Sequence, residues 1–463
     1  MTDFENSDLV EQDDLEGLYG ATDTLVREVK TVIAEDNWDA AKVLVQPLHA
    51  ADFADLFEHL TQDERRAVVS RMEDALDPEF YSHLDESVRE DVIESLDTER
   101  LAEVVQELET DDAVDLIEDL DESEQQELLE AVPPGDRVVY EAALRYPEDS
   151  AGRLMRREAV TVPNYWTVGQ TIDYMRTDAE LPESFYNIYV VGPTHGPLGR
   201  VPVSRLLRTA RPVEMAEIMD MDLKPIPVVM DQEDVAFLFR QYGLASAPVV
   251  DDDGRLIGDI TVDDVVDVIE EEHEEDILKL GGVREDDFYD AVIDTTRARF
   301  SWLLVNLATA IVASVVIGLF DAAIEKMVAL AVLMPIVASM GGNAGTQTLT
   351  VAVRALAVKE LTPTNALRIV GKETLVGGIN GMLFAVLVGL VAWFWFDSTE
   401  IGGIIAAAMV INLIVAGLAG TLIPLTLDRI GMDPAVGSAV VLTTITDVIG
   451  FLSFLGLAAL VLL

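Results

Sequence analysis

Five apolar stretches near the carboxyl terminus constrain this chain more than any other feature. Each has roughly twenty residues or more, enough for a helix to cross a hydrocarbon core of about 30 Å. We therefore expect a five-span α-helical membrane domain embedded in a lipid bilayer. The predicted spans are Phe300 to Phe320, Val328 to Leu356, Thr374 to Phe396, Ile401 to Leu427 and Ala435 to Leu463.

The formal net charge of −53 lies almost entirely before these spans. The last 166 residues contain 9 acids and 7 bases, out of 84 and 31 in the whole chain. An acidic surface repels phosphate backbones, so a nucleic-acid partner is not expected. Only 7 of the bases are lysine, a composition typical of proteins adapted to high salt, and most single surface acids are then merely solvated.

Residue types absent from the chain or from its membrane half exclude several kinds of chemistry. Without cysteine there is no disulfide framework, zinc-thiolate site or cysteine nucleophile. All five histidines precede the spans, which argues against an intramembrane zinc protease. We do not expect an enzyme.

Basic residues at the ends of the spans predict the orientation in the plasma membrane. Lys326 falls on one side, and the opposite side carries Arg297, Arg299, Arg354, Lys359, Arg368, Lys372 and Arg429. The positive-inside rule then places the amino-terminal domains in the cytoplasm and the carboxyl terminus outside. The first residues are acidic and lack the basic region of a signal peptide.

A twelve-residue repeat indicates a helical, solenoid-like domain upstream of the spans. Leu84, Leu96, Leu108 and Leu120 recur at this interval, and each is followed by Asp, Glu, Ser or Thr. Those side chains can cap the next helix, so we expect a stack of short helices over residues 23–148. Residues 1–22 are predicted to be a disordered acidic tail.

Two strand-turn-strand units, about 59 residues apart, follow this helical domain. The second contains the strand Leu256 to Thr261 after a Gly-containing turn, and together the units resemble a tandem pair of CBS domains. The resemblance implies that ATP binds at the second unit, with Thr261 at a phosphate and Asp264 at the ribose. Leu207 stands where the first unit would need the ribose acid. The pair could instead serve only for dimerisation and sensing.

Polar residues inside the spans suggest an ion path, because each is costly in hydrocarbon. Asn343, Gln347, Thr350 and Arg354 share one helix face, and Asp447 is the single acid of the last span. Carboxylate, amide and carbonyl oxygens suit hard cations such as Mg²⁺. Two chains related by a twofold axis would present two Asp447 carboxylates to a hydrated divalent ion, so we expect a homodimer.

Three motifs make the chain similar to the MgtE family of magnesium channels from about residue 24 onward. They are Tyr146 to Met155, Pro335 to Gln347, and Asp433-Pro434-Ala435 leading to Asp447. The resemblance implies a homodimeric Mg²⁺ uptake channel that closes when cytoplasmic Mg²⁺ binds between the N domain, the CBS pair and a plug helix. It implies pore residues Asp447, Asn343, Thr443, Gln347 and Gly342, and regulatory metal ligands Asp264, Asp267, Glu272, Glu275, Asp276, Asp111, Asp112 and Asp115.

The sequence thus predicts a multidomain membrane protein with an α-helical solenoid-like N domain, an α/β tandem CBS pair and an α-helical five-span domain. The predicted divisions are residues 1–22, 23–148, 149–275, 276–299 for the connecting plug helix, and 300–463. Two alternatives stay open. One is a membrane-anchored CBS nucleotide sensor without transport, and the other is a proton-coupled divalent cation exchanger, since one membrane acid can carry a proton.

Overall fold

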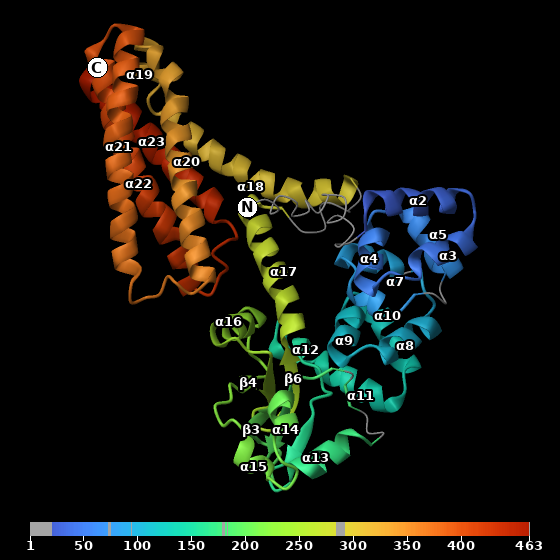
Figure 1. The fold of residues 1–463 in the computed structure, drawn as a ribbon. Helices are drawn as coiled ribbons and strands as arrows, with labels where there is room; N and C mark the ends of the chain where they lie inside the picture. The colour runs from blue at the N-terminus through green and yellow to red at the C-terminus, as the bar shows by residue number, and fades with distance from the viewer. Residues whose placement is uncertain are drawn as a thin grey trace, which may run out of the picture. The chain divides into compact units, whose positions relative to one another are not determined.

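A computed structural model of the chain describes residues 21–72, 76–93, 95–177, 181–182, 184–283 and 292–462. The chain divides into two compact units, residues 1–270 and 271–463, and each is described by itself. Figure 1 shows their helices and strands. Two parts of the prediction lie outside the described residues, namely residues 1–20 of the acidic tail and residues 284–291 of the plug.

The first part of unit 1 is all helical and corresponds to the predicted N domain. Its core contains Phe57, Phe80 and Leu116, which have no exposed surface. The helices are α2 (Asp23–Ala34), α3 (Trp38–Val45), α4 (Ala50–Glu58), α5 (Gln62–Met72), α6 (Glu79–Ser82), α7 (Glu86–Ile93), α8 (Thr98–Glu107), α9 (Thr110–Glu118), α10 (Glu122–Ala131) and α11 (Pro134–Ala143).

The twelve-residue repeat corresponds to successive helices, as predicted. Helices α8, α9 and α10 begin at residues 98, 110 and 122. The Asp97 carboxylate accepts a hydrogen bond from the Arg100 amide at 2.8 Å, and Asp121 forms a capping box with Glu124. The leucine that ends each repeat is buried in the core or packs against it. Capping and leucine burial together explain the regular spacing.

The second part of unit 1 contains two three-stranded sheets with the same topology. Strands β1 (Thr161–Pro163), β2 (Asn187–Val191) and β3 (Pro197–Pro202) form one sheet. Strands β4 (Ile226–Pro227), β5 (Ser246–Val250) and β6 (Leu256–Thr261) form the other. In both sheets the first pair of strands is parallel and the second antiparallel. The helices are α12 (Ala151–Leu154), α13 (Val168–Met175), α14 (Val203–Arg208), α15 (Met215–Ile218), α16 (Gln232–Tyr242) and α17 (Val262–Gly281).

The two sheets meet at equivalent residues of the repeat. Asn187 Nδ2 donates a hydrogen bond to Ser246 Oγ at 2.9 Å, and these residues lie 59 apart in the chain. The Tyr189 hydroxyl lies 2.8 Å from the same Ser246 oxygen. These buried bonds join the halves face to face, which confirms the predicted tandem arrangement.

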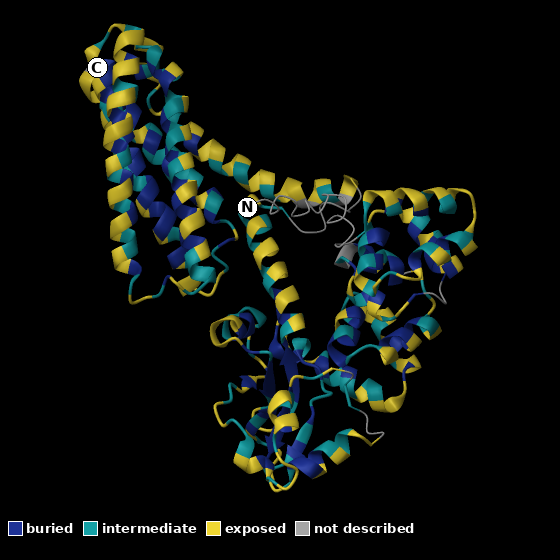
Figure 2. Cartoon of the chain, viewed as in Figure 1, coloured by how far each residue is buried: buried dark blue, intermediate teal, exposed yellow. Residues whose placement is uncertain are grey.

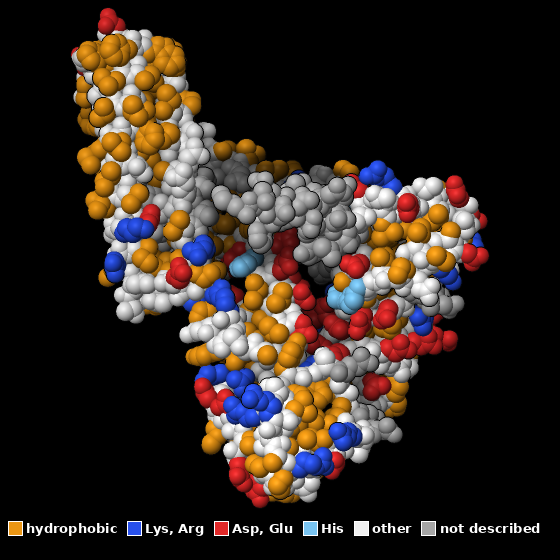
Figure 3. Space-filling model, viewed as in Figure 1, with side chains coloured by type: hydrophobic (Ala, Val, Ile, Leu, Met, Phe, Trp, Pro, Cys, Tyr) orange, Lys and Arg blue, Asp and Glu red, His pale blue; other side chains and the backbone are white. Residues whose placement is uncertain are grey.

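Unit 2 contains the five predicted membrane helices. These are α18 (Val292–Gly318), α20 (Ala329–Ala357), α21 (Ala366–Phe396), α22 (Thr399–Arg429) and α23 (Ser438–Leu462), and the short α19 (Asp321–Lys326) follows α18. Each of the five is long and apolar enough to span a membrane. Large apolar side chains such as Leu383 and Phe394 point outward, and Figures 2 and 3 show this exposed apolar surface.

Helix α22 is the most buried of the five, and α20, α21 and α23 pack against it. Small residues permit this close packing. A Cβ atom at Gly417 would lie 2.6 Å from the Glu373 carbonyl oxygen of α21, and one at Gly420 would lie 2.8 Å from the Gly345 oxygen of α20. This is the usual way in which membrane helices approach each other.

The predicted boundary between the CBS pair and the connecting helix, at residues 275 and 276, falls inside the continuous helix α17. Within α17, no glycine or proline precedes Gly281, so the sequence contains no signal that would end the helix earlier. Within unit 2, Lys279 Nζ lies 2.9 Å from an Asp433 oxygen, and Leu280 packs beside Leu349 and Leu442. The end of α17 is thereby held to the loop before α23.

Candidate ion path and regulatory sites

Asp447 lies in the middle of α23 with its side chain partly exposed. Among the described residues, no hydrogen bond or ion pair reaches its carboxylate, and α23 contains no Lys or Arg. The alternative of an acid neutralised by a neighbouring base therefore has no support in the part of the chain that the structure describes. An unpaired carboxylate in an apolar helix requires water or a cation.

The polar stripe of α20 lies on the outer surface of the single chain. Asn343, Gln347, Thr350 and Arg354 are exposed, whereas the opposite face of the helix, which includes Gly341, Gly345 and Leu349, is buried against neighbouring helices. Asn343 Nδ2 donates to Ser339 Oγ at 3.3 Å. Gly342 is half-buried. A polar face of this length is unfavourable against lipid tails and suits a protein partner or an aqueous path.

Thr443 is bonded within its own helix. Its hydroxyl donates to the Ala439 carbonyl at 3.0 Å, and its carbonyl accepts from the Thr446 hydroxyl at 3.0 Å. Helices α20 and α23 pack together, but no hydrogen bond among the described residues joins Asn343, Gln347 or Thr443 to Asp447. Within one chain, the predicted pore residues lie on neighbouring helices without forming a closed site.

Acidic side chains gather where the N domain packs on the CBS pair within unit 1 (Figure 3). Asp111 is 8% exposed, and no described residue forms a hydrogen bond with its Oδ1 atom. Burial and then the charge of Asp264 raise the pKa of Asp111 well above its ordinary value. Burial and then the charge of Asp264 also raise the pKa of Asp112, to about 7. The two domains thus bring carboxylates together at an energetic cost that a bound cation would offset.

One buried cation, Arg156, lies inside this acidic region. It is 2% exposed; its Nη1 lies 3.0 Å from Glu109 and its Nε lies 3.2 Å from Asp259. Glu158 accepts a hydrogen bond from Thr110 nearby. This arginine directly follows the Tyr146 to Met155 motif but is not part of any predicted site. Arg156 is thus paired with two of the acids in this region, Glu109 and Asp259.

The remaining predicted regulatory acids have varied surroundings. Asp115 is paired with Arg89 at 2.5 Å, and Glu275 is paired with Lys279. Burial, with neighbouring acids, raises the pKa of Asp267 and of Asp276. Glu272 is half-buried on α17. No group of three or more His, Asp or Glu side chains close enough to hold a metal ion occurs in the part of the chain that the structure describes.

The predicted nucleotide residues lie at the turn from β6 to α17. The Thr261 hydroxyl donates to Asp264 Oδ2 at 2.6 Å, and the Thr261 amide donates to the same oxygen at 3.2 Å. Asp264 therefore caps the start of α17 and at the same time interacts electrostatically with Asp111. The predicted ribose ligand and a predicted metal ligand are the same carboxylate.

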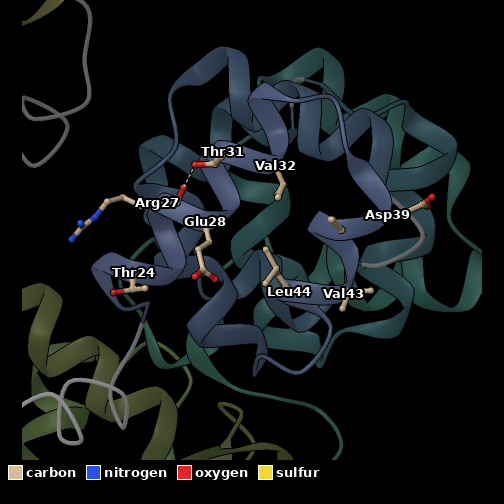
Figure 4. Close-up of a pocket in the computed structure, with 9 residues that line it drawn as sticks. Thr24, Arg27, Glu28, Thr31, Val32, Asp39, Val43 and Leu44 are labelled. Carbon is tan, nitrogen blue, oxygen red and sulfur yellow. Dashed lines mark hydrogen bonds between the residues drawn. The ribbon is translucent and has the colours of Figure 1, made fainter.

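A separate pocket of about 740 Å³ lies between α2 and α3 in the N domain (Figure 4). Its wall includes Val32, Val43 and Leu44, with Arg27 and Asp39 at its edge. None of the predicted site residues lines it.

Three family profiles match successive parts of the chain. The profile described as the MgtE intracellular N domain matches residues 48–149, the CBS domain profile matches residues 215–271, and the divalent cation transporter profile matches residues 334–457.

Curated relatives are similar over most of their length. The chain is 37% identical to the magnesium transporter MgtE of Thermus thermophilus over 334 residues, which are 71% of this chain and 74% of that protein. It is 31% identical to the magnesium transporter MgtE of Bacillus subtilis over 317 residues, which are 68% and 70% of the two chains. A solved cytosolic domain of the Mg²⁺ channel MgtE in complex with ATP is 32% identical, with a TM-score of 0.49, and covers 52% of this chain and 99% of its own.

Proposed function

The chain belongs to the MgtE family of magnesium transporters, and on that premise we propose that it is a homodimeric Mg²⁺ channel in the plasma membrane whose pore contains Asp447. The observation that carries the proposal is the unpaired carboxylate of Asp447 on α23. The exposed stripe of Asn343, Gln347 and Thr350 on the adjacent α20 supports it. A twofold axis beside this surface would bring two sets of oxygen ligands around one hydrated ion.

Selectivity for Mg²⁺ would then come from the hydration shell of the ion. Mg²⁺ gives up its water reluctantly and needs near-octahedral geometry. Two carboxylates match its charge, while amide, hydroxyl and carbonyl oxygens of Asn343, Gln347 and Thr443 would hold its water molecules. Gly342 would leave space for that shell, because no atom lies within 4 Å of a Cβ built there.

We propose Mg²⁺ flux into proteoliposomes as the test of the pore. Asp447→Asn keeps the shape of the side chain and removes its charge, and we expect uptake to fall to the background of empty vesicles. The matched control is Asp397→Asn, which changes an acid at the turn between α21 and α22. Normal uptake by Asp447→Asn would refute the pore assignment, and dependence of wild-type uptake on a pH gradient would favour the exchanger.

We also propose that cytoplasmic Mg²⁺ closes the channel by binding where the N domain meets the CBS pair. Asp111 and Asp264 would hold the ion, and Asp112 would add charge nearby. Further sites along α17 would use Asp267, Glu272, Glu275 and Asp276, whereas Asp115 would act through its pair with Arg89. Without the ion, repulsion between the carboxylates separates the two domains and the channel opens.

Inhibition by internal Mg²⁺ tests this gating. We expect Asp111→Asn and Asp264→Asn to raise the Mg²⁺ concentration that half-closes the channel, with Asp173→Asn on the exposed face of α13 as the control. Unchanged inhibition in both variants would limit these acids to surface solvation. ATP binding at Thr261 and Asp264 would be lost with Asp264→Asn but retained with Asp111→Asn, so measuring both ligands separates the two roles.

A further inference from the structure

Asn412 on α22 is a fully buried polar side chain at the point where three membrane helices meet. Its Nδ2 donates to the Val337 carbonyl of α20 at 2.9 Å. The amide orientation follows from chemistry, because a carbonyl oxygen can only accept. Its Oδ1 atom is buried and has no hydrogen-bond partner among the described residues.

The same amide fills the space beside two glycines. A Cβ atom at Gly341 of α20 would overlap Asn412, and one at Gly450 of α23 would lie 2.9 Å from its Nδ2 atom. Gly341 lies two residues before Asn343, and Gly450 lies three residues after Asp447. Helices α20 and α23, which carry the proposed pore residues, therefore both contact the Asn412 amide of α22.

Stability alone does not account for an amide at this position. A buried carbonyl oxygen without a donor retains its desolvation cost, and an apolar side chain of similar size would avoid that cost. Thr421 on the same helix provides a contrast. It is also fully buried, but its hydroxyl bonds to the Gly417 and Leu418 carbonyls of its own helix and to no other described helix.

We propose that Asn412 is a positioning residue for ion passage, which fixes the spacing between α20 and α23 and thereby the distance between Asn343 and Asp447. The inference rests on the proposed pore. Asn412 does not touch the ion in this role. It acts through its contacts with the Val337 carbonyl, Gly341 and Gly450. The desolvation cost of its Oδ1 atom is the energetic disadvantage of having an amide at this position.

The first test replaces Asn412 with leucine and measures flux, selectivity and stability of the full chain. We expect Asn412→Leu to keep or raise the melting temperature in detergent. We expect its maximal Mg²⁺ flux to fall roughly ten-fold, which corresponds to about 1.4 kcal/mol. The ratio of Mg²⁺ to Ca²⁺ flux should fall as well. Thr421→Val should match the wild type in flux and selectivity. Wild-type flux and selectivity in Asn412→Leu would overturn the inference.

The second test exchanges size between Asn412 and Gly450, and it applies even if the leucine variant does not fold. Gly450→Ala alone should destabilise the protein, because its methyl group meets the amide. Adding Asn412→Ala should restore the melting temperature but not the selectivity. A tolerated Gly450→Ala, or full recovery of selectivity in the double variant, would refute the positioning role. Asp447→Asn tests the pore assignment by itself, so a failure of the positioning role of Asn412 can be distinguished from a failure of the proposed pore.

Discussion

At the scale of single residues, the chain contains buried charges of two kinds. Arg156 is paired with Glu109 and Asp259, so its burial is compensated. Asp111 and Asp112 form no ion pair with any described residue, and their pKa values are raised. The paired charges hold the two domains together, whereas the unpaired acids make their contact respond to protons and cations.

Asp112 predicts how the contact between N domain and CBS pair depends on pH without divalent ions. Its pKa rises from an ordinary value of 3.8 to about 7 in the folded contact, first because of burial and then because of Asp264. Between pH 3.8 and about pH 7, Asp112 is therefore more protonated when the two domains are docked than when they are apart. Docking is therefore strongest below about pH 4 and weakens as the pH rises to about 7. Added Mg²⁺ should reduce this dependence.

Spin-label distances can measure that docking in the full chain. Because the sequence has no cysteine, labels can be placed at two introduced cysteines, at the exposed positions Val138 and Val229. In chelator, the population with the short distance should decline from pH 4 to pH 7. Asp112→Asn should flatten that decline, and an unchanged slope in this variant would contradict the assignment.

At the scale of elements, local patterns predict the helices well and their ends less well. The leucine repeat and the apolar runs recur over short distances, so they identify α8 to α10 and all five membrane helices. Helix α21 begins at Ala366, eight residues before the predicted Thr374. Arg368 and Lys372 limit the apolar run that predicts the span, but charged residues do not stop a helix from forming.

The contacts around the candidate sites could not be predicted in this way. Arg156 binds Asp259, 103 residues away, and Glu109, 47 residues away, and no periodic pattern links these positions. The carboxylate of Asp447 was identifiable because it is an acid in an apolar span. The position of Asn412 between two glycines was not, because it depends on how three helices pack.

The glycines of α22 give a prediction for one pair of helices. Gly417→Ala should lower the free energy of unfolding by about 1–3 kcal/mol, because its Cβ would lie 2.6 Å from the Glu373 carbonyl oxygen and the packed helices would have to shift. Gly403→Ala on the same helix should have no such cost, since no atom lies within 4 Å of a Cβ there. Thermal unfolding in detergent measures both, and equal melting temperatures would show that the helices adjust freely.

At the scale of the whole molecule, the exposed polar face of α20 predicts where a second copy packs. Gln347→Cys should form a disulfide between two chains in the membrane under mild oxidation, because the chain contains no other cysteine. Leu383 on α21 is also exposed but lies in an apolar surface, so Leu383→Cys should form no cross-link in the same assay. Cross-linking through Leu383 and not through Gln347 would place the dimer interface elsewhere.

The contact between the two sheets of the CBS pair bears on how this module can evolve. Asn187 meets Ser246, its own counterpart in the other half, and Tyr189 corresponds in the repeat to Pro248. In a module made of two copies of the first half, two buried tyrosines would compete for the space that Tyr189 fills. In a module made of two copies of the second half, proline would stand at both positions and that space would be empty. The duplicated halves have thus become complementary and cannot be exchanged, so a gene conversion that restored their identity would break the module.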